Sequence, residues 1–204
     1  GQSSDPYNRY TPNNYPAGCV ATAMAQALTV TRHIGSFNDI PLNYDNLIQF
    51  KTISDLSLFP NQADTVGMLL SQIGIGVGME YAANASGAKT ADAVGLIFTN
   101  SGLMNVSNNK SNIRNTLKNY SNGIIIIASR TQPDFLGIIA QGYGHSYIAD
   151  GYRLYNNGTS LIHVNYGYGP GYNGYFLSDL ADPQWTWDAP VEYPYEWKFY
   201  CIYK

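Results

Sequence analysis

The residue with the clearest chemical potential is Cys19, which follows Gly18 at the start of a predicted helix. A thiol at the N-terminal end of a helix lies near free backbone N–H groups and the positive end of the helix dipole, and both favour the thiolate. Gly18 allows a substrate backbone to approach closely. The opposing interpretation is that Cys19 is a small buried apolar residue, which is the usual role of a free cysteine. A second residue is needed to decide between the two.

A nucleophilic cysteine needs a base, and the chain contains 3 histidines, His33, His145 and His163. His33 lies near the end of the helix that begins at Cys19, about 20 Å away at 1.5 Å per residue, which excludes it. His163 lies inside an apolar predicted strand, which favours a structural role. His145 follows Gly144 at the start of an alternating strand, so its side chain can project into a cleft. His145 is therefore the candidate base.

The elements that position these residues follow from the hydrophobic pattern. Residues 1–17 predict an extended or looped segment, and 19–33 predict a helix that is apolar all round and therefore buried. Further helices are predicted at 44–50, 62–73, 90–99 and 110–120, and strands at 123–129, 144–150, 161–165, 174–178 and 197–203. Helices first and strands later indicate an α+β domain rather than a parallel α/β sheet.

Composition excludes several classes of protein. A chain of 204 residues with 45% hydrophobic content can bury the core of one domain, and no linker divides it. A formal charge of −3 with 12% charged residues excludes nucleic-acid binding driven by electrostatics. No apolar run approaches the roughly 20 residues that a membrane-spanning helix needs. We therefore expect no nucleic-acid partner and no membrane span.

Three further patterns are assigned structural roles. Cys19 and Cys201 lie in different contexts, a helix start and a terminal strand, so we expect two separate thiols rather than a disulfide, and no CxxC pair or histidine cluster predicts a metal site. Residues 169–174 form a literal GxGxxG, but they lie between strands, which predicts a hairpin beside the cleft rather than a nucleotide site. The glycines in 74–78 predict a flexible turn after a helix.

Three blocks of sequence carry a family resemblance. GCVATAMAQ around Cys19, GHSYIADGY around His145 and HVNYGYGPGYNGYF from His163 resemble, in this order, the signature blocks of streptopain-type cysteine proteases, bacterial members of the papain-like clan. The resemblance extends to GQSSDPYN at the N-terminus and to LLSQIGIGVGMEYAANASGA in the middle. It implies a papain-like two-lobed α+β fold over residues 1–204. A helical lobe of about 1–120 would hold the cysteine-bearing central helix, an antiparallel β-rich lobe would cover about 121–204, and the active-site cleft would lie between them.

The resemblance also assigns roles to single residues. Cys19 matches the family nucleophile and His145 the family base. Gln2 matches a glutamine whose side-chain amide helps to form the oxyanion hole, where the backbone N–H of Cys19 supplies a further donor. Without the resemblance, Gln2 would count as a disordered terminal residue. Three glycines beside these blocks are expected to line the substrate cleft: Gly18, Gly144 and Gly167.

The third block departs from the family. Family members usually carry tryptophans in HVNWGWGG, whereas this chain has Asn165-Tyr166-Gly167-Tyr168. The resemblance implies that Tyr166 shields and positions the histidine with a smaller ring and an added hydroxyl. In papain-like enzymes generally an asparagine orients the histidine, but in the streptopain branch that role is not clearly filled by an asparagine side chain. Asn165 and Tyr166 are therefore both candidate supporting residues.

The function implied by the resemblance is that of a secreted bacterial cysteine endopeptidase, located outside the cell, at its surface or in the periplasm. It would act through a thiolate–imidazolium pair and an acyl-enzyme, with no cofactor and no metal. Its partners would be protein or peptide substrates and an inhibitory propeptide or a cognate inhibitor protein. The family is made as zymogens, and this chain resembles a mature form without its propeptide. The family often favours an apolar residue two positions before the scissile bond.

Two alternatives use the same residues. The first is a catalytically weak or inactive papain-like domain that binds peptides or host proteins, motivated by the tyrosines of the third block and by the near-terminal position of Gln2. The second is acyl transfer to an amine instead of water, which only product analysis distinguishes from proteolysis.

Overall fold

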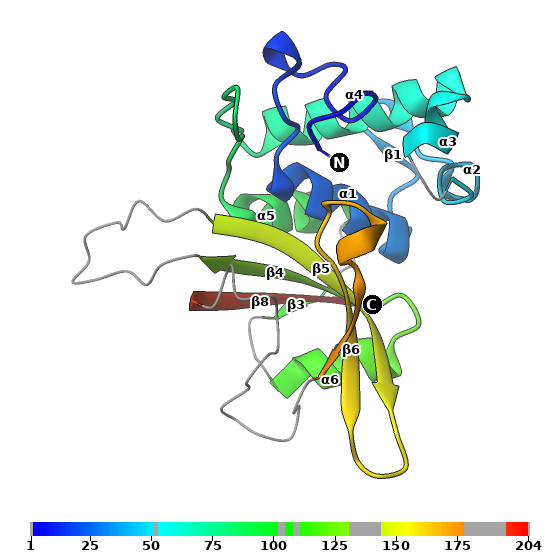
Figure 1. Cartoon of the computed structure of the whole chain (residues 1–204), viewed down its shortest axis with the longest axis vertical. Coiled ribbons are helices and arrows are strands. Elements are labelled where there is room, and N and C mark those ends of the chain that lie inside the picture. Colours follow the sequence, from blue (N-terminus) through cyan, green and yellow to red (C-terminus); the bar gives the residue numbers. More distant parts are fainter. Residues whose placement is uncertain are drawn as a thin grey trace, which may run out of the picture.

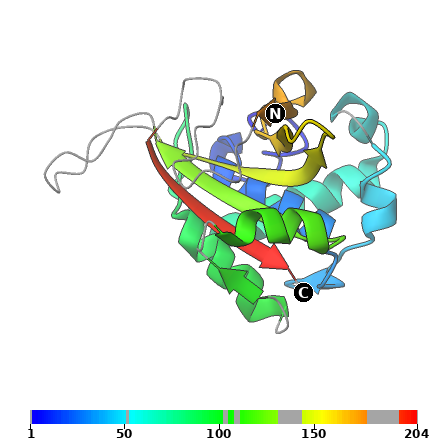
Figure 2. The same cartoon turned by 90° about the horizontal axis from the view of Figure 1, so that it is seen from below.

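The fold is built on a six-stranded antiparallel sheet with helices on both faces (Figures 1 and 2). The computed structural model describes residues 2–50, 53–101, 105–107, 111–130, 144–177 and 195–203. The strand order is β3-β8-β4-β5-β6-β7. The strands are β3 (Asn105–Ser107), β4 (Ile124–Arg130), β5 (Gly144–Leu154), β6 (Ser160–Asn165), β7 (Gly174–Leu177) and β8 (Tyr195–Tyr203).

The helices divide between the two faces of the sheet. On one face, α1 (Cys19–Thr31) packs against β5 and β4 and is flanked by α4 (Pro60–Gly76) and α5 (Thr90–Ser101), as Figure 1 shows. On the other face lies α6 (Ser111–Asn119), which is nearest the viewer in Figure 2. The remaining elements are short: η1 (Pro12–Asn14), β1 (Ser36–Phe37), β2 (Ile40–Pro41), α2 (Tyr44–Leu47), α3 (Ile53–Ser57) and η2 (Pro170–Tyr172).

The alternation of side chains along β4 explains why its isoleucine run is buried throughout. Ile124 and Ile126 belong to the apolar cluster on the α1 side, whereas Ile125 and Ile127 belong to the cluster that contains Ile113 of α6. Successive residues of a strand point to opposite faces, so a strand covered on both sides needs apolar residues at every position. The two clusters together form the core of the molecule.

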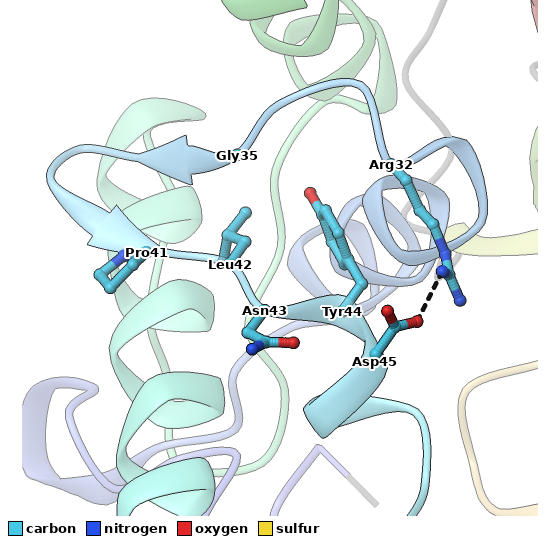
Figure 3. A pocket seen from close by; sticks show the side chains of 7 residues that line it. All are labelled: Arg32, Gly35, Pro41, Leu42, Asn43, Tyr44 and Asp45. Atoms are coloured by element: carbon cyan, nitrogen blue, oxygen red, sulfur yellow. Dashed lines mark hydrogen bonds and ion pairs between the residues drawn. The ribbon is translucent and has the colours of Figure 1, made fainter.

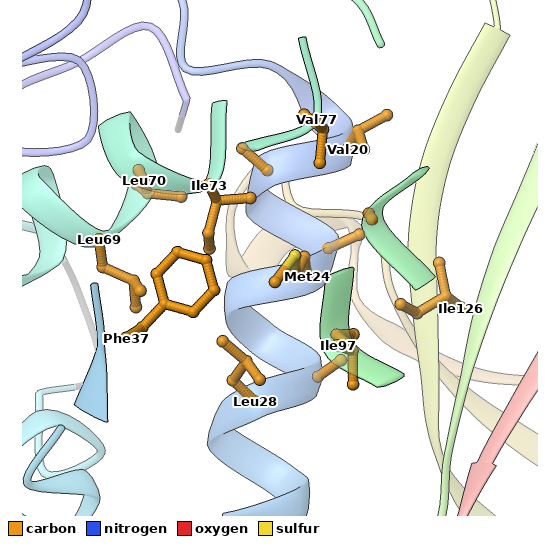
Figure 4. Close-up of a cluster of buried hydrophobic side chains, with 14 of the residues drawn as sticks. Val20, Met24, Leu28, Phe37, Leu69, Leu70, Ile73, Val77, Ile97 and Ile126 are labelled. Atoms are coloured by element: carbon orange, nitrogen blue, oxygen red, sulfur yellow. The ribbon is translucent and has the colours of Figure 1, made fainter. Parts of the chain in front are cut away.

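The central helix α1 is buried as predicted. Figure 4 shows Met24 and Leu28 of α1 among side chains from α4, α5, β1 and β4. Burying one such side chain stabilises the fold by about 1.5–3 kcal/mol. The helix ends at Arg32, whose left-handed backbone (φ 52°) turns the chain into the β1–β2 hairpin and α2, as Figure 3 shows. Packing on all sides fixes the position of α1, and therefore the position of its first residue, Cys19.

The predicted elements agree with the structure in type and order, and the α+β class is confirmed. The boundary between the helical and β-rich parts differs, because β3 pairs with β8 and α6 packs on the sheet. Both elements precede residue 120, so the sheet region begins before residue 121. The glycines in 74–78 also differ from the prediction, since α4 continues through Gly76. A Cβ at Gly74 would lie 2.0 Å from the hydroxyl oxygen of Tyr81, so a larger residue would displace the end of that side chain.

Within the described residues, no helix combines the length and the apolar character required to cross a membrane.

Candidate active site

Cys19 is the first residue of α1 and carries a free thiol. Gly18 before it adopts φ 90°, and a Cβ there would lie 2.7 Å from the sulfur of Met79, so the turn into the helix requires glycine. Burial raises the pKa of the Cys19 thiol. Hydrogen bonds from the backbone and side chain of Ser146, and from backbone N–H groups at the start of α1, act in the opposite direction. The protein thus supplies donors to a thiol that burial keeps protonated.

His145 lies near the start of β5 and is 4% exposed. Its Nε2 lies 2.9 Å from the backbone oxygen of Tyr166. A carbonyl oxygen can only accept a hydrogen bond, so Nε2 carries the hydrogen and Nδ1 is the basic nitrogen. Burial lowers the pKa of His145 to about 4, against a smaller opposing effect of the Tyr166 carbonyl. His145 is therefore neutral near pH 7, in one defined tautomer.

The third block supports His145 through its backbone and through Tyr168. The Tyr168 ring stacks on the imidazole at a centroid distance of 4.5 Å and an interplanar angle of 5°, whereas the Tyr166 ring lies 6.5 Å away. Tyr166 thus contributes its carbonyl, and the closest shielding ring is that of Tyr168. The side-chain oxygen of Asn165 accepts a hydrogen bond from the backbone N–H of Gly167 at 2.9 Å, which stabilises the turn after β6.

A cavity of about 150 Å³ brings residues from five parts of the chain together. Four of the residues predicted from the sequence line it, namely Gln2, Cys19, Gly144 and His145. Gly167 instead faces α1, where a Cβ would lie 3.2 Å from a methyl group of Thr22. The full lining is Gln2, Ser3, Pro16, Cys19, Asn84, Ala85, Ser86, Gly144, His145 and Tyr168.

Gln2 is held beside Cys19 by its backbone. Its carbonyl oxygen accepts a hydrogen bond from the backbone N–H of Ala17 at 2.9 Å, two residues before the thiol. Its side-chain Oε1 is buried, without a hydrogen-bond partner among the residues that the structure describes. A buried amide oxygen without a hydrogen-bond partner costs free energy. Such an atom is typical of a functional site, where a bound ligand supplies the partner. Gln2 lines the same cavity as Cys19, and the nitrogen of its side-chain amide is a donor of the type that an oxyanion requires.

The rest of the N-terminal segment is anchored on α4. Arg9 forms ion pairs with Asp64 of α4 at 2.6 Å and with Asp5 at 2.7 Å. Gly67 of α4 provides the space for this contact, because a Cβ there would lie 2.7 Å from the backbone oxygen of Pro6. The segment that carries Gln2 is therefore fixed at several points.

Sequence reasoning missed Ser146 and Thr90. Their hydroxyl oxygens lie 2.6 Å apart, and both residues are buried. Ser146 directly follows His145 in β5. Successive residues of a strand point to opposite faces, and this alternation was the signal that Ser146 faces α1. Thr90 begins α5, and no local pattern connects it with the site.

The other sequence candidates lie apart from this cavity. Cys201 is buried, and burial raises the pKa of its thiol to about 11. His163 Nδ1 lies 2.5 Å from a carboxylate oxygen of Asp150 in the neighbouring strand. Among the residues that the structure describes, no group of three or more His, Cys, Asp or Glu side chains could hold a metal ion.

A larger and more open hollow of about 450 Å³ lies at the other end of α1 (Figure 3). The ion pair between Arg32 and Asp45, at 2.8 Å, lies at its edge. Its lining contains neither a thiol nor an imidazole, so we place the chemistry in the smaller cavity.

Comparison with known proteins bears on the fold and on the family of the chain. The structure of a fragment of prointerpain A from Prevotella intermedia superposes with a TM-score of 0.60 at 18% sequence identity, which shows a shared papain-like fold. The match covers 93% of this chain and 64% of that fragment. No curated protein matches the chain. The model of the Peptidase C10 family matches residues 1–176, and the chain therefore belongs to the Peptidase C10 family of cysteine peptidases.

Proposed function

We propose that the protein is a cysteine endopeptidase that hydrolyses peptide bonds through Cys19 and His145. The observation that carries the proposal is the single cavity that unites a thiol at a helix start, a histidine of fixed tautomer and the amide of Gln2. These are the groups that acyl transfer to a thiol requires: a nucleophile, a base and a donor for the oxyanion.

The first half of the reaction forms an acyl-enzyme. The Cys19 thiol gives its proton to Nδ1 of His145, and the sulfur attacks the carbonyl carbon of the scissile peptide bond. The amide of Gln2 and the backbone N–H of Cys19 stabilise the resulting oxyanion. The tetrahedral intermediate then collapses: the C–N bond breaks, and Nδ1 returns its proton to the departing amine. Tyr166 accepts a hydrogen bond from Nε2 throughout and so favours the imidazolium.

The second half releases the product. Water takes the place of the departed amine, and Nδ1 removes one of its protons as the oxygen attacks the thioester carbon. The C–S bond breaks, the acid product leaves, and the proton on Nδ1 returns to the sulfur. Atoms and charges balance over the cycle, and no cofactor takes part.

The electrostatics of the free site determine when the charged pair forms. Burial raises the pKa of Cys19 and lowers that of His145, so neither group becomes charged alone near pH 7. Proton transfer between them creates two opposite charges at once, and their mutual attraction offsets the cost of burial. We infer that the thiolate–imidazolium pair forms mainly when substrate fills the cavity.

The test uses the two cysteines as a matched pair. Cys19→Ala should lower kcat for a protein substrate by at least about 1,000-fold, because the nucleophile is lost. Cys201→Ala should keep the activity, since Cys201 lies in the core away from the cavity. Undiminished hydrolysis by Cys19→Ala would refute the proposal.

A second candidate is a peptide-binding domain with little or no catalysis. The observation in its favour is that burial opposes both charges of the proposed pair. Saturable binding of peptides to the unmodified protein, with no hydrolysis over hours, would establish this candidate in place of the first. Transfer of the acyl group to an amine would instead appear as a new amide product in mass spectrometry.

The cellular setting is also a proposal that rests on family membership. We propose that the protein is secreted by a bacterium and acts outside the cytoplasm, and that a propeptide or an inhibitor protein covers the cavity before activation. The similar structure of prointerpain A, a pro-form by its name, supports the last point. Mapping of cleavage sites in a peptide library tests the expected apolar residue two positions before the scissile bond.

A further inference from the structure

The loop that carries the Tyr166 carbonyl is closed by two asparagines. It joins β6 to β7 and belongs to the orange segment beside α1 in Figure 1. Asn165 is the last residue of β6, and Asn173 directly precedes β7. The ladder between these strands ends at the pair of Val164 and Gly174, so the two asparagines come next on either side. They therefore lie where the loop leaves the sheet and where it returns.

Both asparagine side chains accept a hydrogen bond from the backbone of this loop. The backbone N–H of Tyr166 donates to Oδ1 of Asn173 at 3.2 Å, and that of Gly167 donates to Oδ1 of Asn165 at 2.9 Å. A backbone N–H can only donate, so the oxygen of each amide must face the loop. Both bonds are partly buried, which limits the competition from water.

Together these bonds fix the direction of the Tyr166 carbonyl. Peptide units are planar, so the soft backbone torsions of Tyr166 are its φ and ψ. The unit before its Cα is held through the N–H that binds Asn173. The unit after its Cα contains the carbonyl and is held through the Gly167 N–H that binds Asn165. Asn165 alone holds the second unit, so Asn173 is needed to prevent rotation at Tyr166.

The carbonyl held in this way is the hydrogen-bond partner of His145 Nε2, at 2.9 Å. The stacked ring of Tyr168 covers one face of the imidazole, but stacking allows the imidazole to turn in its own plane. A directed acceptor at Nε2 opposes that turn and keeps the hydrogen on Nε2. The orientation of Nδ1, the basic nitrogen, therefore depends on the direction of this carbonyl.

We propose that Asn173 is a positioning residue that holds His145 in its reactive orientation through the backbone carbonyl of Tyr166. The inference rests on the proposed function, in which Nδ1 of His145 is the base. No contact between Asn173 and His145 is required, because the loop backbone transmits the constraint. The constraint acts on the chemical step, since a misplaced base lowers the rate more than it weakens the binding of substrate.

The first measurement is the exchange of the His145 Nε2 hydrogen with water, followed by NMR of protein that contains isotopically labelled histidine. His145→Gln identifies the signal among those of the 3 histidines. Asn173→Ala should speed the exchange about fivefold, which is the effect of losing one hydrogen bond of ordinary strength. Asn173→Asp keeps an oxygen acceptor on a side chain of the same shape and should keep the exchange slow.

The second measurement is the hydrolysis of a peptide substrate. Asn173→Ala should lower kcat about fivefold with little change in KM, and Asn173→Asp should restore most of the lost activity. Thermal unfolding of each variant checks the fold. If Asn173→Ala does not fold, Asn173→Leu takes its place, because leucine has nearly the shape of asparagine and no acceptor.

Asn157→Ala is the matched control. Oδ1 of Asn157 accepts a hydrogen bond from the backbone N–H of Thr159 at 3.0 Å, a contact of the same type in the exposed turn between β5 and β6. Neither residue lines the cavity. The variant should therefore leave both the Nε2 exchange of His145 and kcat unchanged.

The inference is overturned if Asn173→Ala leaves the Nε2 exchange unchanged, if Asn173→Asp is as defective as Asn173→Ala, or if Asn157→Ala has the same effect. Hydrolysis by the unmodified protein, with unchanged exchange in Asn173→Ala, would reject this inference and keep the proposed function. Faster exchange in Asn173→Ala that Asn173→Asp restores, without hydrolysis by the unmodified protein, would keep the positioning of His145 and reject the proposed function.

Discussion

The hydrogen bond between His145 Nε2 and the Tyr166 carbonyl decides which ring nitrogen can act as the base. It also binds the imidazole to the turn after β6, whose shape Asn165 supports through Gly167. The backbone therefore holds the histidine, and the side chain at position 166 need not be a tryptophan for this purpose. This explains how a chain with tyrosines in the third block can hold His145 in one tautomer.

The buried neutral state of His145 predicts a pH-dependent stability. Its pKa is about 4 in the folded protein and about 6.5 when unfolded, so the unfolded chain binds the proton first as the pH falls. The stabilisation is fully present above about pH 6.5 and is lost as the pH falls toward 4. Between pH 7 and pH 4.5, the free energy of unfolding should fall by about 2 kcal/mol more for the unmodified protein than for His145→Gln.

Urea unfolding at the two pH values measures this difference. His163→Gln is measured in parallel, because it removes a histidine that lies outside the cavity and is hydrogen-bonded to Asp150. Equal pH dependence of the unmodified protein and His145→Gln would show that His145 is not buried in the neutral form.

The stacking of Tyr168 on His145 predicts a second effect at this scale. Burial is the largest cause of the low pKa of His145, and the ring of Tyr168 covers one face of the imidazole. Tyr168→Ala should therefore raise the pKa of His145 toward 6.5, whereas Tyr168→Phe, which keeps the ring, should leave it low. NMR titration of the histidine C–H signals distinguishes the two outcomes, and an unchanged pKa in Tyr168→Ala would contradict the shielding role.

At the level of elements, the contact between the N-terminal segment and α4 predicts a defect confined to the chemical step. Gly67→Ala places a Cβ against the backbone oxygen of Pro6 and should displace the segment that carries Gln2. Because Gln2 is proposed to act on the oxyanion, kcat should fall by about 10-fold or more with little change in KM.

Gly95→Ala is the matched control, since Gly95 is an exposed glycine of α5 whose Cβ would contact nothing within 4 Å. It should keep full activity and stabilise its helix slightly. A rise in KM with unchanged kcat in Gly67→Ala would indicate a role for the segment in binding rather than in oxyanion stabilisation.

The elements also show what sequence can and cannot predict. Local pattern was sufficient for α1 and β4, because continuous apolar content and length distinguish a buried helix from a buried strand. It was insufficient for β3, whose three residues acquire their conformation by pairing with β8 at the far end of the chain. The Thr90–Ser146 contact joins residues 56 positions apart and depends on how α5 meets β5, which no spacing encodes. Gln2 was identified by family resemblance alone.

At the scale of the whole molecule, the fold separates the two thiols. Cys19 lines the smaller cavity, whereas Cys201 lies in the apolar cluster that contains Ile113 of α6. The pKa of Cys201 is raised to about 11, so it should react with iodoacetamide at pH 8 at least about 100-fold more slowly than an ordinary thiol of pKa near 8.5. Denaturation should abolish this protection, and rapid alkylation of Cys201 in the folded protein would contradict the packing described for β8.

The most direct test of the proposed function is to trap the acyl-enzyme. The protein is quenched in acid during turnover of an activated peptide ester, and its peptides are analysed by mass spectrometry. The proposed mechanism predicts that the acyl group of the substrate is found on Cys19, and that it is absent from Cys201 and from His145→Ala. Turnover without an acyl group on Cys19, or equal acylation in His145→Ala, would contradict the mechanism.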